Sequence, residues 1–276
     1  MASEKRSKIR SQLPEKNFIS FLDKILNFFP PLGKVLTTLF GAQEYYMLEL
    51  FRIIERRFKI NLLFITNRYL MKGRWGGQVV PLNINFDPET RFLPTQEILS
   101  ILSKSKVTGI SNCYCRETQI KYGDNPDFNY PLQTCIHIGL GKDLQEIPYK
   151  SENLKKISKQ EVKTLLHECD DKGLVHQLIF FPSPQYYYVV CNCDPKYCVI
   201  LNGFLKRGSP QMVKSDFIAI IDLSSCTNCG ICEEWCHFGA RRIINGSFLF
   251  NATRCFGCGI CVSKCPNNAI KLGIKK

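Results

Sequence analysis

Long apolar runs are missing from this sequence. No stretch of 18 uncharged apolar residues occurs, so we expect no transmembrane helix. No apolar segment with a small-residue cleavage site follows the basic residues 1–10, so we expect no secretory signal. A dinucleotide-binding fingerprint, a Ser-His-Asp set and motif-placed catalytic carboxylates are also missing, and the glycine-rich segments at 73–77 and 139–142 lack phosphate-loop spacing. These absences argue against a membrane-spanning protein and leave no signature of a nucleotide-dependent or hydrolytic enzyme.

Acidic residues are scarce relative to basic ones. The 276 residues include 24 Asp and Glu against 37 Lys and Arg, a formal net charge of +13. This balance favours an acidic protein partner, an anionic membrane surface or nucleic acid. The alternative is a lysine-rich surface without a dedicated partner, and composition does not separate the two. Hydrophobic residues make up 45% of the chain, enough for a core, and the length allows two domains without requiring more.

Cysteine, by contrast, is abundant, with 15 residues. The odd number, and the regular spacing of many of them, argue against a disulfide framework and for a reducing compartment. We therefore expect a cytoplasmic protein.

Eight cysteines form two regular runs. The first is Cys226-x2-Cys229-x2-Cys232-x3-Cys236, and the second is Cys255-x2-Cys258-x2-Cys261-x3-Cys265-Pro266. Three cysteines at this spacing on a glycine-rich loop direct their thiolates to one 4Fe–4S cubane, and the fourth reaches the other cubane. The predicted ligands are therefore Cys226, Cys229, Cys232 and Cys265 for cluster 1, and Cys255, Cys258, Cys261 and Cys236 for cluster 2. Zinc would give no reason for the third regularly spaced cysteine of each run.

These runs resemble those of the bacterial-type dicluster ferredoxins over about residues 217–274. The resemblance implies two 4Fe–4S clusters in a ferredoxin-like domain with a pseudo-two-fold repeat. The proline expected after the fourth cysteine is present as Pro266 but replaced by His237 in the first run, which changes the polarity beside one cluster. Two oxidised clusters with their thiolates carry about −2 each and lower the net charge to roughly +9.

The N-terminal part, residues 1–72, is predicted to be a helical segment behind a polar tail. Pro30 and Pro31 predict an elbow between two short helices within residues 18–40. Residues 44–59 have an amphipathic helical pattern, with an apolar face formed by Met47, Leu50, Phe51, Ile54 and Phe58. We expect this face to pack on the protein's own core, and the alternative is a peripheral contact with the inner face of a membrane or with a partner.

The middle part, residues 73–215, is predicted to be a mixed α/β domain. Strands are expected at 79–86, 107–110, 175–181 and 186–190, and a helix at 95–104 with Thr95 as its cap. The capping box from Ser158 to Glu161 predicts a second helix, which Gly173 ends. Cys169 lies on the apolar face of that helix and is predicted to be a core residue.

Six cysteines of the middle part form a second candidate site: Cys113, Cys115, Cys135, Cys191, Cys193 and Cys198. Residues i and i+2 of an extended segment point the same way, so each Cys-x-Cys pair is predicted to present two thiols to one site. The hypothesis is a third iron–sulfur cluster or a zinc ion, and the alternative is a set of thiols without metal. The spacing matches no standard run and favours iron–sulfur over zinc only slightly. Because one site takes four ligands, at least two of the six would be spare.

A wider resemblance covers residues 73–276. The segments Phe92–Thr95, Cys113–Arg116, Pro131–Cys135 and Cys191–Cys193, followed by the two cysteine runs, resemble a group of uncharacterised 4Fe–4S binding proteins of anaerobic bacteria and archaea. Members of that group carry more cysteines where this chain has Asp194–Tyr197. We therefore expect an α+β protein: a helical N-terminal segment (1–72), an α/β cysteine-containing domain (73–215) and a dicluster 4Fe–4S ferredoxin domain (216–276).

Electron transfer is the leading functional hypothesis. The ferredoxin domain would take an electron from a donor and pass it between its clusters to a redox partner, which the net charge predicts to be acidic. The first alternative is an iron–sulfur reductase, an oxidoreductase with a substrate or third metal site in the middle domain. The second alternative is a redox-responsive nucleic-acid-binding protein, which ranks last because no nucleic-acid-binding motif is present. The sequence assigns no catalytic residue.

Overall fold

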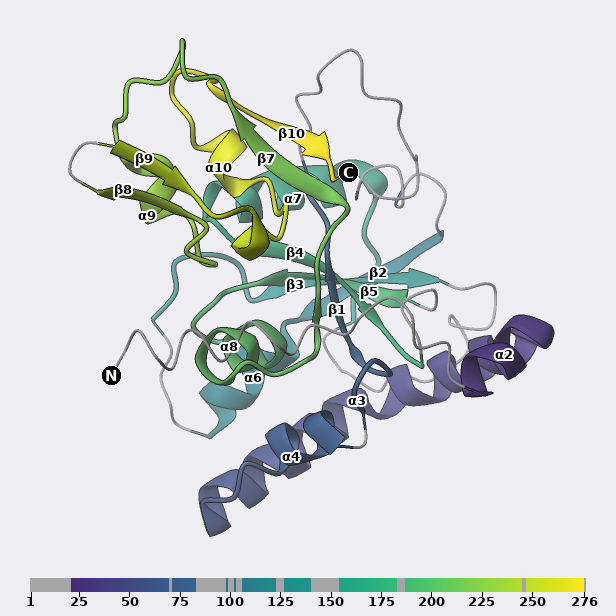
Figure 1. The fold of residues 1–276 in the computed structure, drawn as a ribbon. Coiled ribbons are helices and arrows are strands. Elements are labelled where there is room, and N and C mark those ends of the chain that lie inside the picture. Colours follow the sequence, from purple (N-terminus) through teal and green to yellow (C-terminus); the bar gives the residue numbers. More distant parts are fainter. Residues whose placement is uncertain are drawn as a thin grey trace.

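The computed structural model describes residues 21–69, 71–82, 98, 102, 106–122, 127–139, 154–182, 187–244 and 247–275. Three parts lie against one another: a group of N-terminal helices, a central six-stranded sheet, and a C-terminal unit with two small two-stranded sheets (Figure 1). The predicted mixture of helices and strands is confirmed. Within the described residues, every helix is too short or too polar to cross a bilayer.

The N-terminal helices are α2 (Phe21–Phe28), α3 (Pro30–Phe58) and α4 (Leu62–Tyr69). The predicted elbow at the two prolines is confirmed, because α2 ends at Phe28 and α3 begins at Pro30, but the second helix is not short, since α3 has 29 residues. Pro30 and Pro31 occupy its first positions, where the backbone N–H that proline lacks would have no partner in the helix. Lys59 ends the helix in the left-handed conformation, with φ 57°.

The face of α3 that packs on the sheet also differs from the predicted one. Residues at intervals of four, Phe40, Glu44 and Leu48, face the interior, and the ring of Phe40 stacks on Phe181 at 4.0 Å. Leu50 and Phe58, which were expected to be buried, are 53% and 64% exposed. The longer helix begins earlier than the sequence suggests, and its upstream residues set which side meets the sheet.

The central sheet has the strand order β2-β3-β5-β4-β1-β6, and only the β1–β6 pair is parallel. Its strands are β1 (Gly76–Val79), β2 (Lys106–Asn112), β3 (Gln133–Gly139), β4 (Val175–Phe180), β5 (Tyr187–Cys193) and β6 (Met212–Val213). Of the strand expected at 79–86, only Val79 is in a strand among the described residues, as the last residue of β1 beside β6, and residues 83–86 lie outside them. A Cβ atom on Gly76 would lie 2.2 Å from the Gln211 carbonyl oxygen, so the close strand approach requires glycine there.

The predicted helix at 95–104 falls mostly outside the described residues. The helix that follows the capping box is confirmed as α7 (Lys159–Asp171). The Glu161 backbone N–H donates to the Ser158 hydroxyl (3.2 Å), and the Ser158 N–H donates to the Glu161 carboxylate (2.8 Å). The helix is followed by Gly173 with φ 72°, and Cys169 is fully buried, as predicted.

The two faces of the sheet have separate cores. Val190 and Leu178 point to the core that α7 covers. Val189 and Ile179, their alternating neighbours, point to a second core shared with α3, α6 (Tyr114–Lys121) and α8 (Val199–Arg207). Helix α8 was not predicted from the sequence. All six cysteines of the middle part lie in or against this second core.

The C-terminal unit contains two antiparallel strand pairs, β7–β10 and β8–β9. Its elements are β7 (Phe217–Ile221), α9 (Ile231–Glu234), β8 (Arg241–Ile244), β9 (Ser247–Phe250), a 3₁₀ turn (Ala252–Arg254), α10 (Ile260–Ser263) and β10 (Ile270–Ile274). It contacts the sheet domain at the C-terminal end of α7. His237, which replaces the expected proline, donates from Nε2 to the Gly173 carbonyl oxygen (2.8 Å), and Lys264 donates to the Asp171 carbonyl oxygen (2.9 Å).

Candidate metal centres

Four cysteines line a first cavity in the C-terminal unit. Three come from the first run and one from the second: Cys226, Cys229, Cys232 and Cys265. The loop turns back on itself through two left-handed residues, Asn228 (φ 54°) and Gly230 (φ 84°). The backbone N–H of Asn228 points at the Cys226 sulfur (3.4 Å), and that of Ala269 points at the Cys265 sulfur (3.3 Å). Such N–H···S contacts stabilise thiolates that hold iron.

A second cavity has the reciprocal set, with three cysteines from the second run and one from the first: Cys255, Cys258, Cys261 and Cys236. Aromatic rings, including Phe250 and Phe256, form part of its wall. Gly257 (φ 66°) is required at its place, because a Cβ atom there would lie 2.2 Å from the Phe217 carbonyl oxygen. The Ala240 N–H points at the Cys236 sulfur (3.2 Å), matching Ala269 at the first cavity. The structure thus sorts the eight cysteines into the two sets named from the sequence.

A buried arginine lies between the two cavities. Arg241 is 2% exposed, and its side chain lies against Cys232 of the first cavity and Cys261 of the second. Burial raises the pKa of both thiols, and the charge of Arg241 offsets part of that rise. Its guanidinium packs on the rings of Phe248 and Phe250 (5.3 and 5.1 Å), and in the described part of the chain Nη1 and Nη2 have no oxygen or nitrogen partner, so the thiols of Cys232 and Cys261 are the polar groups beside it. A buried cation without an anionic partner is costly, so negative charge is required at these thiols. An anionic iron–sulfur cluster in each cavity fits this requirement.

The two cavities differ in exposure. Cys229 of the first cavity is exposed to solvent. Burial raises the pKa of Cys258 well above the ordinary thiol value, and that of Cys261 to about 12. Such thiols need a bound metal ion to become thiolates at neutral pH. The first cavity therefore lies at the surface and the second lies against the sheet domain.

Comparison with known proteins agrees with this arrangement. The family described as 4Fe-4S dicluster domain matches residues 225–270. No curated protein matches the chain. The prediction of an iron–sulfur, ferredoxin-type domain near the C-terminus is therefore confirmed, whereas the wider resemblance over residues 73–276 stays a prediction.

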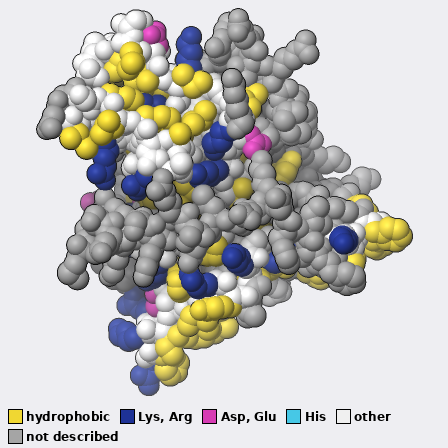
Figure 2. Space-filling model, viewed as in Figure 1, with side chains coloured by type: hydrophobic (Ala, Val, Ile, Leu, Met, Phe, Trp, Pro, Cys, Tyr) yellow, Lys and Arg dark blue, Asp and Glu magenta, His cyan; other side chains and the backbone are white. Residues whose placement is uncertain are grey.

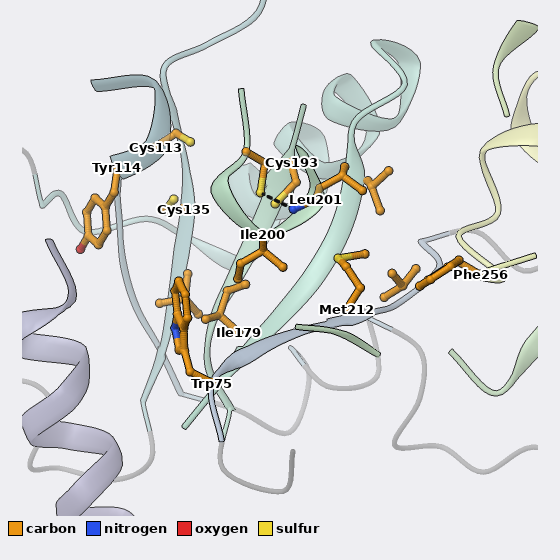
Figure 3. Packing of buried hydrophobic residues seen from close by; sticks show 14 of the residues in the cluster. Trp75, Cys113, Tyr114, Cys135, Ile179, Cys193, Ile200, Leu201, Met212 and Phe256 are labelled. Carbon is orange, nitrogen blue, oxygen red and sulfur yellow. Dashed lines mark hydrogen bonds between the residues drawn. The ribbon is translucent and has the colours of Figure 1, made fainter. Parts of the chain in front are cut away.

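The structure also brings the other six cysteines together. Cys135 on β3 lies opposite Cys191 on β5, with 3.8 Å between the two sulfur atoms. Cys193 follows at the end of β5, and Cys198 is the residue that caps α8. Figure 3 shows Cys113, Cys135 and Cys193 within this core, with Leu201 of α8 nearby.

The extended geometry predicted for both Cys-x-Cys pairs is wrong for one of them. Cys113 and Cys115 are not in an extended segment, because Cys113 caps α6 and Cys115 lies in its first turn. Their thiols nevertheless hydrogen-bond each other. Only Cys191 and Cys193 use the strand geometry that was expected, with both residues on β5.

The surroundings favour negative charge at two of the six thiols, because the pKa values of Cys113 and Cys198 are lowered by hydrogen bonds from neighbouring thiols, whereas neighbouring thiols and burial raise those of the other four. Arg116 is 1% exposed and its charge lies beside the Cys113 thiol, while its guanidinium donates to the Pro131 carbonyl oxygen (3.1 Å) and packs 4.7 Å from the Tyr130 ring. Hydrogen bonds from Cys115 and Cys135 hold the pKa of Cys113 well below the ordinary thiol value. The start of α8 contributes two backbone donors, from Val199 to the Cys115 sulfur (3.5 Å) and from Leu201 to the Cys198 sulfur (3.4 Å; dashed in Figure 3).

Sequence reasoning missed Arg241. The strand pattern contained a signal for it. Phe248 and Phe250 are two residues apart on β9 and therefore face the same side of the strand pair, and Arg241 on β8 is paired with Phe250. Arg116 lies in the motif Cys113–Arg116, but nothing in the spacing of that motif shows that the arginine side chain is buried against the cysteines.

Proposed function

We propose that this protein is an iron–sulfur electron-transfer protein that holds two 4Fe–4S clusters in the C-terminal unit and passes electrons to a redox partner. One observation carries the proposal: each of two neighbouring cavities is lined by three cysteines of one run and the fourth of the other. This is the ligand arrangement of two-cluster ferredoxins. Cys226, Cys229, Cys232 and Cys265 would hold cluster 1, and Cys255, Cys258, Cys261 and Cys236 would hold cluster 2.

The chain's own residues determine how such clusters behave. A bound 4Fe–4S cluster supplies reversible one-electron storage. The backbone donors at Asn228, Ala240 and Ala269 lower the charge density on the thiolates, and Arg241 adds a buried positive charge beside both clusters. All of these contacts favour the more negative, reduced state.

The exposure of the two cavities supports a direction for electron exchange. The first cavity opens to the surface, and exposed apolar side chains stand around it: Leu223 (69% exposed), Ile244 (47%) and Leu249 (49%). Figure 2 shows yellow hydrophobic side chains at the upper left, over the C-terminal unit. A redox partner would dock there and exchange electrons with cluster 1, and the net charge favours an acidic partner. Cluster 2 would be the inner site.

Two double variants test the crossed ligation. Because Cys226 and Cys265 are assigned to the same cluster, Cys226→Ala/Cys265→Ala should retain about four irons per chain of the eight expected. Cys226→Ala/Cys236→Ala removes one ligand from each cluster and should retain close to none. If each run instead held its own cluster, the two results would be exchanged. Cys169→Ala changes a fully buried cysteine outside the cavities and should keep about eight irons.

A second candidate function, an iron–sulfur reductase, is favoured by one specific observation. A cavity between α3, α4, α6 and α8 reaches Cys115 and Cys198, and its charged lining is mainly basic. Arg52, Lys196, Lys206 and Arg207 line it together with Glu55, which pairs with Arg52 (3.6 Å) and Arg207 (3.9 Å). A small anionic substrate would fit these charges. Turnover of such a substrate by the reduced protein alone would favour a reductase, and turnover only with a partner would favour electron transfer.

A further inference from the structure

The six cysteines of the sheet domain form a closed ring of contacting thiols. Each thiol lies beside two others, and following these neighbours leads back to the start, in the order Cys113, Cys115, Cys198, Cys193, Cys191, Cys135; the Cys135 and Cys191 sulfur atoms are 3.8 Å apart. The ring joins four elements that are far apart in the sequence: the start of α6, β3, β5 and the start of α8. We name this set the thiol ring.

The spacing of the thiols identifies the kind of metal site they suit. Two thiolates on one tetrahedral ion, each about 2.3 Å from it, are about 3.8 Å apart. Terminal thiolates of a cubane bind different irons and are about 6 Å apart. The Cys135 and Cys191 sulfur atoms are 3.8 Å apart, which matches a shared ion. In the second ferredoxin cavity, by contrast, Cys261 raises the pKa of Cys258 through charge, and no thiol–thiol hydrogen bond contributes to the pKa of either residue.

The number of ions follows from the shape of the ring. A regular hexagon with edges of about 3.8 Å has a radius of the same length, which exceeds the 2.3 Å bond of a single central ion. In the described residues no three Cys, His, Asp or Glu side chains are already grouped around one ion position, so the thiols would have to move inward as the ions bind. Two tetrahedral ions need eight bonds, and six thiolates supply eight when two on opposite sides of the ring bridge both ions. Every pair of neighbours in the ring then shares an ion.

We propose that the thiol ring binds two zinc ions as a binuclear zinc–thiolate centre. An all-thiolate tetrahedral set is the ligand field that zinc prefers. Six thiolates and two dications leave a charge of about −2, which Arg116 and the backbone donors of Val199 and Leu201 oppose. The proposal uses all six cysteines, and it does not depend on electron transfer by the C-terminal unit.

Such a centre would fix the surface on which the second ferredoxin cavity rests. It would hold the start of α8 to β5 and α6. Phe204 of α8 packs on Phe256 at 5.0 Å, and Phe256 stacks on Phe238 at 4.2 Å beside the cysteines of that cavity. The zinc centre would therefore stabilise the sheet domain and the position of the inner cluster at once.

Metal analysis of the full chain tests the proposal. The protein would be produced in medium containing iron and zinc, purified without oxygen and analysed for zinc, iron and sulfide. We expect about two zinc ions per chain in the wild type and in Cys169→Ala. Cys191→Ala/Cys193→Ala should lose at least nine-tenths of the zinc and keep its iron. Because zinc and iron are counted separately, failure of this proposal is distinct from failure of the proposed function.

X-ray absorption at the zinc edge of the wild type keeps the test decisive if the double variant does not fold. We expect only sulfur neighbours at about 2.3 Å and a zinc–zinc distance. A wild-type chain without zinc, zinc with nitrogen or oxygen neighbours, four additional irons with four additional sulfides, or disulfide bonds among the six cysteines would each overturn the proposal. Zinc retained by Cys191→Ala/Cys193→Ala would also overturn it.

Discussion

Replacing Arg241 should make both iron–sulfur clusters harder to reduce. Its guanidinium is buried and lies against Cys232 of cluster 1 and Cys261 of cluster 2. The variant Arg241→Met keeps an apolar stem between Phe248 and Phe250 and removes the charge. Since reduction adds an electron to each cluster, loss of a nearby cation raises the energy of the reduced state and moves both potentials to more negative values.

The size of the shift follows from Coulomb's law. For a separation of about 6 Å and an effective dielectric constant of about 20, one unit charge contributes about 2.8 kcal/mol. For a one-electron couple this is about 120 mV. The guanidinium charge is spread over several atoms and solvent reorganises in the variant, so we expect shifts of roughly 60–120 mV in both clusters.

The assay is an anaerobic redox titration followed by EPR, on variants that retain about eight irons. Arg242→Met is the matched control, because Arg242 is the next residue and is exposed, where water and salt screen its charge. Its potentials should stay within about 20 mV of the wild type. Arg241→Lys keeps the charge and should restore at least half of the shift. Potentials that are unchanged in Arg241→Met, or equal in the Arg241→Met and Arg242→Met variants, would refute the reasoning.

Three further predictions concern glycine, pH and metal removal. Gly257→Ala should lose cluster 2, because its new Cβ would lie 2.2 Å from the Phe217 carbonyl oxygen. The new Cβ of Gly230→Ala would have its nearest neighbour 3.9 Å away, so this variant should lose only about 1–2 kcal/mol of stability and keep both clusters. Equal iron contents in the two variants would contradict this. Burial raises the pKa of Glu44 from 4.5 to about 7. The contribution of this carboxyl group to stability is therefore fully present below pH 4.5 and is lost, by about 3 kcal/mol, as pH rises to 7. Glu44→Gln should unfold at a higher temperature than the wild type at pH 8 but not at pH 5, and an equal difference at both pH values would contradict this assignment. Removing the iron with a chelator should expose residues 217–274 to proteolysis, because this small unit has few buried apolar residues of its own. An apo-protein that resists cleavage there would show that the clusters are not needed for folding.

The C-terminal unit was the most predictable part of the chain. Cysteine ligands on tight loops have strict spacing, so the two runs indicated both the loops and the crossed sets of cysteines that the cavities contain. The ends of α7 were equally clear, because a capping box and a left-handed glycine are local signals. In each case the information lies within a few neighbouring residues.

The thiol ring was only partly predictable. The sequence shows six cysteines but not their order in space, which depends on the pairing of β3 with β5 and on α8 returning to α6. The reasoning for Cys113 and Cys115 assumed an extended segment, whereas the backbone turns into α6 at Cys113. Which face of α3 is buried also depends on long-range packing, as the exposed side chains of Leu50 and Phe58 show.

The central claim is that the C-terminal unit holds two 4Fe–4S clusters that store electrons. The most direct test is to purify the wild-type chain without oxygen, count iron and sulfide, and titrate it with a one-electron reductant under EPR. We predict about eight irons and eight sulfides, an uptake of about two electrons per chain, and a spectrum of two interacting spins. A colourless, iron-poor protein that takes up no electrons after reconstitution would contradict the account.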